Sequence, residues 1–315
     1  MRPFNQMDNH TYDTDFYITA FSHVYGKHFL FILFFLLYLI CLSWNILIIA
    51  VTNIDPHLQS PMYFFLSNLS FVDASYTSVT VPKLMDIFIT GNIRVSFTGC
   101  FVQLYFFTSM ACTEILLLTA MAYDRYVAIC KPLYYMLVMR KMNCILLVTG
   151  SWICGYGNSL FVTIFASYLS FCGPKHINQL FCDIKVLTKI SCGDTKEFQT
   201  MIYIEALIMG LCPFLLILMS YSKIVANILT MHSTGKRQKA FSTCTAHLSV
   251  LFMFYGTLLC MYMSPPSENS EDLDQIFAVL YLAVTPTINP LIYSLRNKDI
   301  KMAIKKTMIW IPSRL

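Results

Sequence analysis

The chain has 315 residues, of which 57% are hydrophobic and only 12% are charged, and its mean hydropathy is +0.59. A soluble domain carries about twice that charged fraction, so the composition indicates a chain embedded in lipid. The formal net charge of +5 could indicate a nucleic-acid partner. The basic residues, however, gather beside the ends of apolar runs and form no stripe with interleaved aromatic residues, which argues against that partner.

Long apolar runs determine the expected fold class. A run of roughly 20 apolar residues crosses the hydrocarbon of a bilayer as a helix, since lipid offers the backbone no hydrogen-bond partner. Seven runs reach that length: 29–52, 61–84, 96–130, 143–166, 199–228, 240–263 and 273–294. We therefore expect an all-α integral membrane protein with an N-terminal segment (1–28), a seven-helix domain (29–294) and a tail (295–315).

The placement of Lys and Arg residues predicts the orientation of these helices. Most of the 22 basic residues lie on one side of the predicted bundle: Arg125, Lys131, Arg140, Lys141, Lys223, Lys236, Arg237, Lys239, Arg296, Lys298, Lys301, Lys305, Lys306 and Arg314. The positive-inside rule places this side in the cytoplasm and the N-terminus outside. No continuous apolar stretch precedes Phe29, so we expect no cleaved signal peptide. A glycosylation sequon begins at Asn9, on the predicted outer side.

Four of the 12 cysteines fall on the predicted outer side, where disulfides can form: Cys100, Cys172, Cys182 and Cys192. Four cysteines allow three pairings, and the spacing alone does not select one. The remaining cysteines lie within the runs or at their cytoplasmic ends, where a buried reduced thiol is expected.

Two carboxylates lie inside the predicted membrane, where an ionisable side chain costs a few kcal/mol or more. Asp73 belongs to the second run and Glu114 to the third, and Asn45, Ser70 and Asn289 would lie at similar depth. Such oxygens could hold a hard cation or share a proton. The alternative is a satisfied polar network that only holds the helices together.

The third run ends in Asp124-Arg125-Tyr126 at the predicted cytoplasmic face. An acid beside an arginine at a helix end could serve as interfacial anchoring, with the arginine reaching the headgroups. The position of the triplet, at the inner end of the third of seven runs, favours a functional role.

Two further ionisable residues, Glu205 and His247, lie within the predicted membrane helices. Glu205 lies early in the fifth run and could face either the bundle and a ligand or the outer headgroups and water. His247, in the sixth run, is expected to be a hydrogen-bonded packing residue and not a metal ligand.

Proline and glycine interrupt the later runs at Pro213, Gly256, Pro286 and Pro290. Such residues kink spanning helices and free backbone carbonyls. A kink can be a passive feature of shape, or a place where the bundle changes between two packings.

Several stretches, in order along nearly the whole chain, resemble the odorant receptors among the rhodopsin-like G-protein-coupled receptors. The stretches are PMYFFL (61–66), LSFVD (69–73), MAYDRYVAIC (121–130), KAFSTCTAHL (239–248), FYGT (254–257) and PTINPLIYSLRN (286–297). One departure is Trp44-Asn45, where this family usually has Gly-Asn. Asn45 keeps the polar group, but Trp is bulky where glycine allows close helix approach.

The resemblance implies disulfides between Cys100 and Cys182 and between Cys172 and Cys192. It also implies a sodium site at Asp73 and Glu114, with no other cofactor, and a short basic amphipathic helix from Lys298 to Lys306 on the inner leaflet.

A switch and a signalling partner are implied as well. Arg125 would engage a stimulatory olfactory G protein acting through adenylyl cyclase, with Tyr221 and Tyr293 rearranging beneath it, at the plasma membrane. The residues assigned to this switch are Asp124, Arg125, Tyr126, Tyr221, His247, Asn289, Pro290 and Tyr293.

The ligand pocket is placed by helical phase, counting outward from Arg125 in steps of three and four. The expected lining is Phe107, Thr108, Ala111, Cys112, Ile115, Glu205, Ala206, Met209, Tyr255, Leu258, Leu259, Tyr262, Val279 and Leu282. A mostly apolar cavity with a few polar anchors suits a small organic molecule, and Glu205 would favour amines or hydrogen-bond donors.

Three rival functions are weighed against this reading. A secondary transporter would show repeated halves and paired broken helices, and an enzyme would show a catalytic motif, of which none is found. A rhodopsin-like receptor for a non-odorant ligand is the third alternative.

Overall fold

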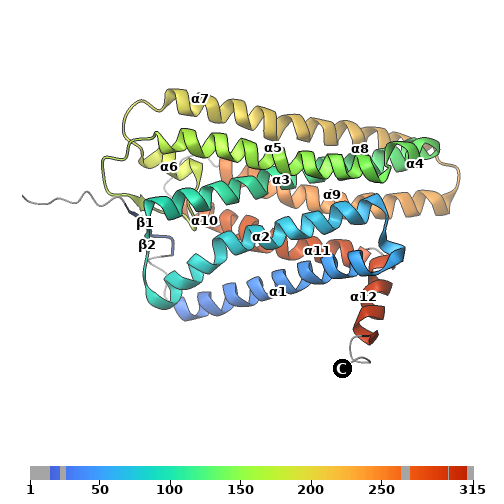
Figure 1. The fold of residues 1–315 in the computed structure, drawn as a ribbon, viewed down its shortest axis with the longest axis horizontal. Helices are drawn as coiled ribbons and strands as arrows, with labels where there is room; N and C mark the ends of the chain where they lie inside the picture. Colours follow the sequence, from blue (N-terminus) through green and yellow to red (C-terminus); the bar gives the residue numbers. More distant parts are fainter. Residues whose placement is uncertain (1–14, 22–25, 264–269, 297, 311–315) are drawn as a thin grey trace, which may run out of the picture.

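The computed structural model describes residues 15–21, 26–263, 270–296 and 298–310. The expected glycosylation site Asn9 lies outside these residues. Within them, seven long helical segments form the bundle: α1 (Lys27–Ile54), α2 (Pro61–Thr90), α3 (Phe97–Cys130), α5 (Lys141–Ser167), α7 (Lys196–Glu205) with α8 (Cys212–Thr230), α9 (Thr234–Met263), and α10 (Ser270–Val279) with α11 (Thr285–Arg296). These segments run side by side along the long axis of the molecule (Figure 1), so the predicted seven-helix fold is confirmed.

Short elements connect the long ones. They are β1 (Phe16–Ile18), η1 (Pro56–Leu58), β2 (Arg94–Val95), η2 (Pro132–Tyr134), α4 (Tyr135–Val138), β3 (His176–Ile177) and α6 (Ile184–Ile190), and α12 (Lys298–Trp310) follows the last long helix. In Figure 1, β1 and β2 lie at one end of the bundle, and α4 and α12 lie at the other.

Six of the long segments are long and apolar enough to cross a membrane. The exception is α2, which carries Asp73, Lys83 and Asp86 among many hydroxyl residues. Its 30 residues nevertheless pack between α1 and α3, and Asp73 is turned into the bundle. Polar residues therefore lower the hydropathy of α2 without removing it from the bundle.

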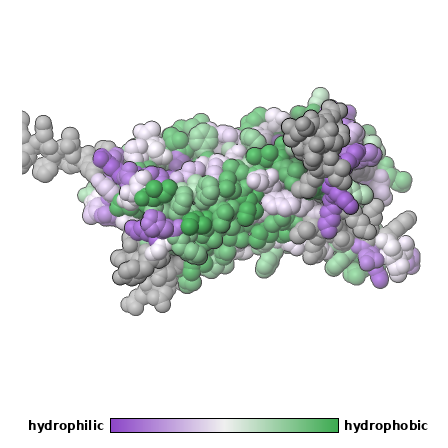
Figure 2. Space-filling view, turned by 90° about the horizontal axis from the view of Figure 1, so that it is seen from below, coloured by the Kyte–Doolittle hydropathy of each residue, from purple (hydrophilic) through white to green (hydrophobic). Residues whose placement is uncertain are grey.

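The outward faces of the long helices are apolar. On α1 the exposed side chains include Phe29, Ile32, Leu36 and Ile46. Figure 2 shows hydrophobic surface gathered along the middle of the molecule, with hydrophilic surface toward both ends. A water-soluble monomer rarely exposes so large an apolar area, and lipid contact explains it.

Two π-helical turns adjoin the prolines of the fifth and seventh segments. The turn η3 (Ala206–Leu211) joins α7 to α8 just before Pro213, and η4 (Leu280–Val284) joins α10 to α11 just before Pro286. A proline lacks the N–H that an α-helical hydrogen bond needs, and the wider turn absorbs the mismatch. By contrast, α9 runs without interruption through Gly256.

The end of the bundle that the sequence predicts to lie outside, called the outer end below, is closed by a three-stranded sheet of order β2-β1-β3 and by two disulfides. Cys100 at the start of α3 is bonded to Cys182, and Cys172 is bonded to Cys192. Both pairings implied by the family resemblance are therefore confirmed. Together they hold the loop between α5 and α7 over the mouth of the bundle.

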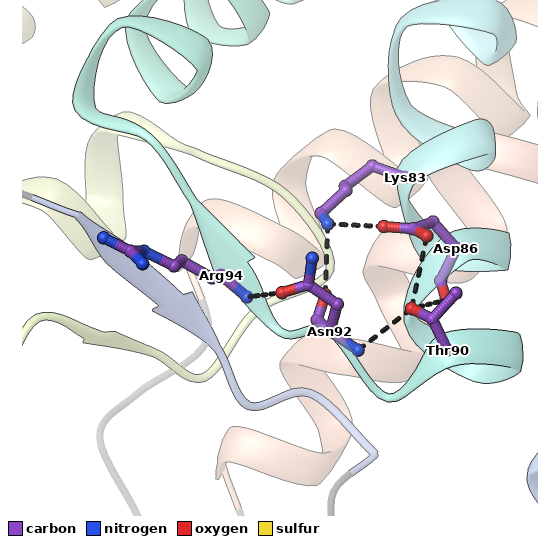
Figure 3. Close-up of polar contacts among 5 residues, drawn as sticks. All are labelled: Lys83, Asp86, Thr90, Asn92 and Arg94. Carbon is purple, nitrogen blue, oxygen red and sulfur yellow. Dashed lines mark hydrogen bonds and ion pairs between the residues drawn. The ribbon is translucent and has the colours of Figure 1, made fainter.

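A polar network ends α2 on the same side, as Figure 3 shows. Lys83 Nζ donates to Asp86 Oδ2 at 2.7 Å and to the Asn92 carbonyl at 3.0 Å. Thr90 Oγ1 donates to the Asp86 carbonyl at 2.8 Å, and the Arg94 N–H donates to Asn92 Oδ1 at 3.2 Å. These bonds tie the residues that follow α2 back to its last turns, and they position β2 for pairing with β1.

At the opposite end, α12 is amphipathic, as the resemblance implied. Ile300 and Ala303 are buried, whereas Lys301 and Lys305 are exposed. The hydroxyl of Tyr63, at the start of α2, donates to Asp299 Oδ2 at 3.2 Å and ties this helix to the bundle.

Candidate ligand-binding and switch sites

A polar cluster lies inside the bundle where α1, α2, α3 and α11 meet. Asn289 Nδ2 donates to both carboxylate oxygens of Asp73 at 3.3 Å. Asp73, Glu114 and Asn45 are each at most 2% exposed. The structure thus brings together the residues that the sequence placed at one depth.

Asn45 has a second role that follows from Pro290. Because Pro290 has no N–H, the carbonyl of Pro286, four residues earlier, loses its helical partner. Asn45 Nδ2 donates to that carbonyl at 3.1 Å, across from α1. The neighbouring Trp44 is only half-buried, so its bulk does not displace Asn45.

Several oxygens of the polar cluster remain unsatisfied. Asn45 Oδ1, Glu114 Oε1 and Asn289 Oδ1 are buried and have no hydrogen-bond partner among the described residues. A buried acceptor without a partner costs free energy, so such a group of oxygens needs either a proton or a cation nearby.

The inner end of α3 contains a three-residue polar chain. Arg125 forms an ion pair with the fully buried Asp124, with its Nε 3.0 Å from Asp124 Oδ2. The hydroxyl of Tyr135, in the short helix α4, donates to Asp124 Oδ1 at 2.8 Å. Tyr135 was not predicted, since a tyrosine in a loop carries no sequence signal of its own.

A second contact, beside the polar residues Asp124, Arg125 and Tyr135, joins α8 to α9. The hydroxyl of Tyr221 lies 2.6 Å from Nδ1 of His247 in a hydrogen bond. His247 is fully buried, in agreement with the prediction of a hydrogen-bonded packing residue. Tyr293, in α11, is buried and its hydroxyl makes no hydrogen bond within the described part of the chain.

An aromatic cluster fills the outer half of the bundle. The Phe107 ring centroid lies 4.8 Å from Tyr76, 4.3 Å from Phe181 and 6.2 Å from Tyr281. The hydroxyls of Tyr76, Tyr255 and Tyr281 are buried without a hydrogen-bond partner among the described residues. Apolar rings with unsatisfied hydroxyls form a surface that accepts a small ligand with one polar group.

The second outer loop covers this cluster. Phe181 contacts Phe107, and the N–H of Cys182 donates to Gln103 Oε1 at 3.0 Å. Asp183 accepts a bond of 2.8 Å from Tyr262, and Lys185 Nζ lies 2.8 Å from Asp274 Oδ2. Burial raises the pKa of the Asp183 carboxyl above its ordinary value.

Comparison with known proteins decides between the functions that this geometry allows. Residues 34–310 match the family model described as olfactory receptor. The chain is 43% identical to human (Homo sapiens) olfactory receptor 13C9, over 95% of this chain and 96% of the relative. It is also 44% identical to human olfactory receptor 6B1, over 96% of both chains.

The chain belongs to the olfactory receptor family. It is therefore an odorant receptor embedded in a membrane, and it is not an enzyme. Odorant ligands and coupling to a G protein are general properties of the family. This assignment excludes the transporter and the non-odorant receptor as alternatives.

Most of the pocket residues predicted for this olfactory receptor face the interior. Those that are buried or half-buried are Phe107, Thr108, Ala111, Cys112, Ile115, Glu205, Met209, Tyr255, Leu258, Val279 and Leu282. The aromatic residues Tyr76 and Phe181 were not predicted, because α2 and the second outer loop were not counted as part of the pocket. Tyr281 was not predicted either, because it lies in the π-helical turn η4, where counting at 3.6 residues per turn fails.

Three predicted pocket residues are exposed in the structure, which corrects the prediction. Ala206 is exposed whereas its neighbour Glu205 is half-buried, because successive residues of a helix point about 100° apart and the two cannot both face the interior. Leu259 is 50% exposed because the inward line of α9 runs through Phe254, Leu258 and Met261. Tyr262 is also 42% exposed, with its hydroxyl bound to the outer loop.

Glu205 of this olfactory receptor is directed into the helix bundle. Its Oε1 accepts a hydrogen bond of 3.0 Å from Asn158 Nδ2 in α5, and the Cys112 thiol of α3 lies 3.9 Å away. Of the two readings of this acid, its contacts with α3 and α5 favour the one in which it faces the bundle. Asn158 was not predicted, since an amide on the fourth helix gives no indication of its partner.

Proposed function

We propose that the receptor binds a small, mostly apolar odorant between the aromatic cluster and Glu205. The single observation that carries this proposal is the group of buried tyrosine hydroxyls at Tyr76, Tyr255 and Tyr281, which have no hydrogen-bond partner within the described ranges. A ligand with one hydrogen-bonding group would satisfy such hydroxyls, while its apolar body packs against Phe107. Glu205 adds a preference for an amine or another donor.

We also propose that the receptor activates a stimulatory olfactory G protein and raises cyclic AMP, at the plasma membrane with its N-terminus outside. The arrangement of Asp124, Arg125 and Tyr135 supports this, since the ion pair withdraws Arg125 from the cytoplasmic face. Outward movement of α9 would break the bond between Tyr221 and His247 and open that face.

The polar cluster fits a sodium ion. The carboxylates of Asp73 and Glu114 would hold it, together with the unsatisfied oxygens of Asn45 and Asn289. Hard cations prefer oxygen ligands of this kind. The ion would supply a positive charge that offsets the repulsion between the two buried carboxylates.

A cyclic-AMP reporter assay across an odorant panel tests the signalling proposal. The expected result is a ligand-dependent rise that is lost in Arg125→Ala while surface expression persists. A response that survives Arg125→Ala would overturn the proposed coupling. Loss of the response in Tyr255→Phe, with basal signalling unchanged, would support the aromatic site.

A further inference from the structure

A groove on the outside of the bundle is separate from the proposed odorant site. It runs over α3 between α5 and α8, which both pack against α3 and lie beside it in Figure 1. It encloses about 530 Å³ and its lining includes Leu116, Ala120, Leu147, Gly150, Leu216 and Met219. Ala120 forms part of the buried floor, and a side chain added at Gly150 would meet only open space.

The walls of this groove are effectively apolar. Besides Tyr123 and Tyr126, the hydroxyl residues of the groove are Thr119, Ser151 and Ser220, which donate to carbonyls of their own helices at 2.8, 2.8 and 2.9 Å. Their hydrogens are therefore not available to a ligand. An apolar trough that opens toward the bilayer takes a hydrocarbon chain in preference to a polar molecule.

One end of the groove is cationic. Lys223 Nζ lies 5.6 Å from the centroid of the Tyr126 ring, and Lys131 Nζ lies 5.9 Å from it. Both lysines are exposed, and no carboxylate of the described residues lies within ion-pair distance of either. The charge at this end is therefore available to an anion from the membrane surface.

The length of the groove matches one leaflet. From Leu116 to Tyr126 the floor rises along about 15 Å of helix, which is half of the roughly 30 Å hydrocarbon core. An acyl chain lying in the groove would thus end at the middle of the bilayer, and its headgroup would lie beside Lys223.

We propose that this groove binds an anionic phospholipid, with one acyl chain between α5 and α8 and the phosphate at Lys223 and Lys131. In the orientation proposed above, the lipid belongs to the cytoplasmic leaflet. The site is distinct from the odorant site, because it faces the bilayer and not the bundle interior. A lipid bound beside Tyr126 would contact the inner end of α3 and make it sensitive to the lipid composition of the membrane.

The test uses full-length receptor in nanodiscs that contain phosphatidylcholine and a trace of phosphatidylserine with a photoreactive acyl chain. After irradiation, labelled peptides of α5 and α8 are quantified by mass spectrometry. Gly150→Leu fills the groove and is expected to abolish this labelling. Gly157→Leu is the matched control, since Gly157 lies on the same helix, also faces open space and does not line the groove.

Charge is tested in the same way. Lys223→Gln is expected to reduce labelling about fivefold, the loss expected for one cation near an anionic surface. Lys301→Gln, on the exposed face of α12, is the control and should leave labelling unchanged. Undiminished labelling in Gly150→Leu would overturn the groove as the site.

Competition on the unaltered receptor keeps the proposal testable if Gly150→Leu does not fold. Unlabelled phosphatidylserine should displace the probe at a concentration at least about fivefold lower than phosphatidylcholine does. Equal displacement by the two lipids would overturn the anionic preference. If the unaltered receptor is labelled by the lipid probe but gives no odorant response, the proposed odorant site fails and the lipid site does not.

Discussion

Asn158 in α5 donates a 3.0 Å hydrogen bond to Glu205 in α7, so a half-buried amide directs the acid toward α3. The same amide nitrogen lies 3.3 Å from the Cys112 sulfur. Three helices thus meet at one carboxylate, which lies beside the predicted pocket. The contact decides the direction of Glu205, which helical phase alone left open.

Glu205→Gln is expected to weaken the response to amines. The amide keeps an oxygen that Asn158 can bind, so packing is preserved and only the charge is lost. A charge-assisted bond exceeds a neutral one by about 1.4 kcal/mol, so the half-maximal concentration of an activating amine should rise roughly tenfold. Neutral odorants should be unaffected in the cyclic-AMP assay. Glu197→Gln, on the exposed first turn of α7, is the control.

Asp124→Asn is expected to raise basal signalling. The change weakens the ion pair that holds Arg125, and it leaves an oxygen for the Tyr135 hydroxyl. Release of Arg125 favours the active packing of the inner ends. Cyclic AMP should rise severalfold without ligand, measured at equal surface expression. Basal signalling that stays at the wild-type level would show that the ion pair does not restrain the switch.

Asp73→Asn should remove a sodium-dependent stabilisation. If sodium is present at ten times its dissociation constant, it contributes about 1.4 kcal/mol. The wild-type melting temperature should then be higher in sodium chloride than in choline chloride, and the difference should vanish in the variant. Asp183→Asn, which lies outside the cluster, should retain the difference. Equal wild-type melting in both salts would contradict a sodium site.

The outer loop should be more stable at lower pH because of Asp183. Burial raises the pKa of this carboxyl above its ordinary value, so the folded protein holds a proton that the unfolded chain releases. Stability therefore falls as pH rises from the ordinary value through the raised one. Asp183→Asn keeps the acceptor for Tyr262 and should flatten this dependence in thermal melts. A variant profile parallel to the wild-type profile would assign the pH effect to another group.

Gly155→Ala should destabilise the contact between α3 and α5. A Cβ at Gly155 would lie 2.2 Å from Thr113 Oγ1 and 3.0 Å from the Ser109 carbonyl, so the helices must separate. Overpacking of this kind costs about 1–3 kcal/mol. Gly157→Ala, with nothing within 4 Å of its Cβ, should melt like the wild type. Unchanged melting of Gly155→Ala would show that this interface is looser than the structure indicates.

The sequence predicted those features that depend on interactions within one segment of the chain. Each apolar run enters the membrane by itself, so hydropathy predicted the seven helices. Asp73 and Glu114 lie within those runs, and this position predicted that both acids are buried. Motifs that are contiguous in the chain then indicated the family, the inner switch at Arg125 and the disulfides.

Only the tertiary structure decided which side chains meet. The π-helical turns η3 and η4 change the helical phase by an amount that a count of 3.6 residues per turn does not contain, so the residues before and after each turn cannot be placed on one face by counting. Phe181 enters the aromatic cluster because a disulfide holds its loop over the bundle, 74 residues along the chain from Phe107. Contacts between distant segments depend on how helices tilt and pack, and no single segment carries that information.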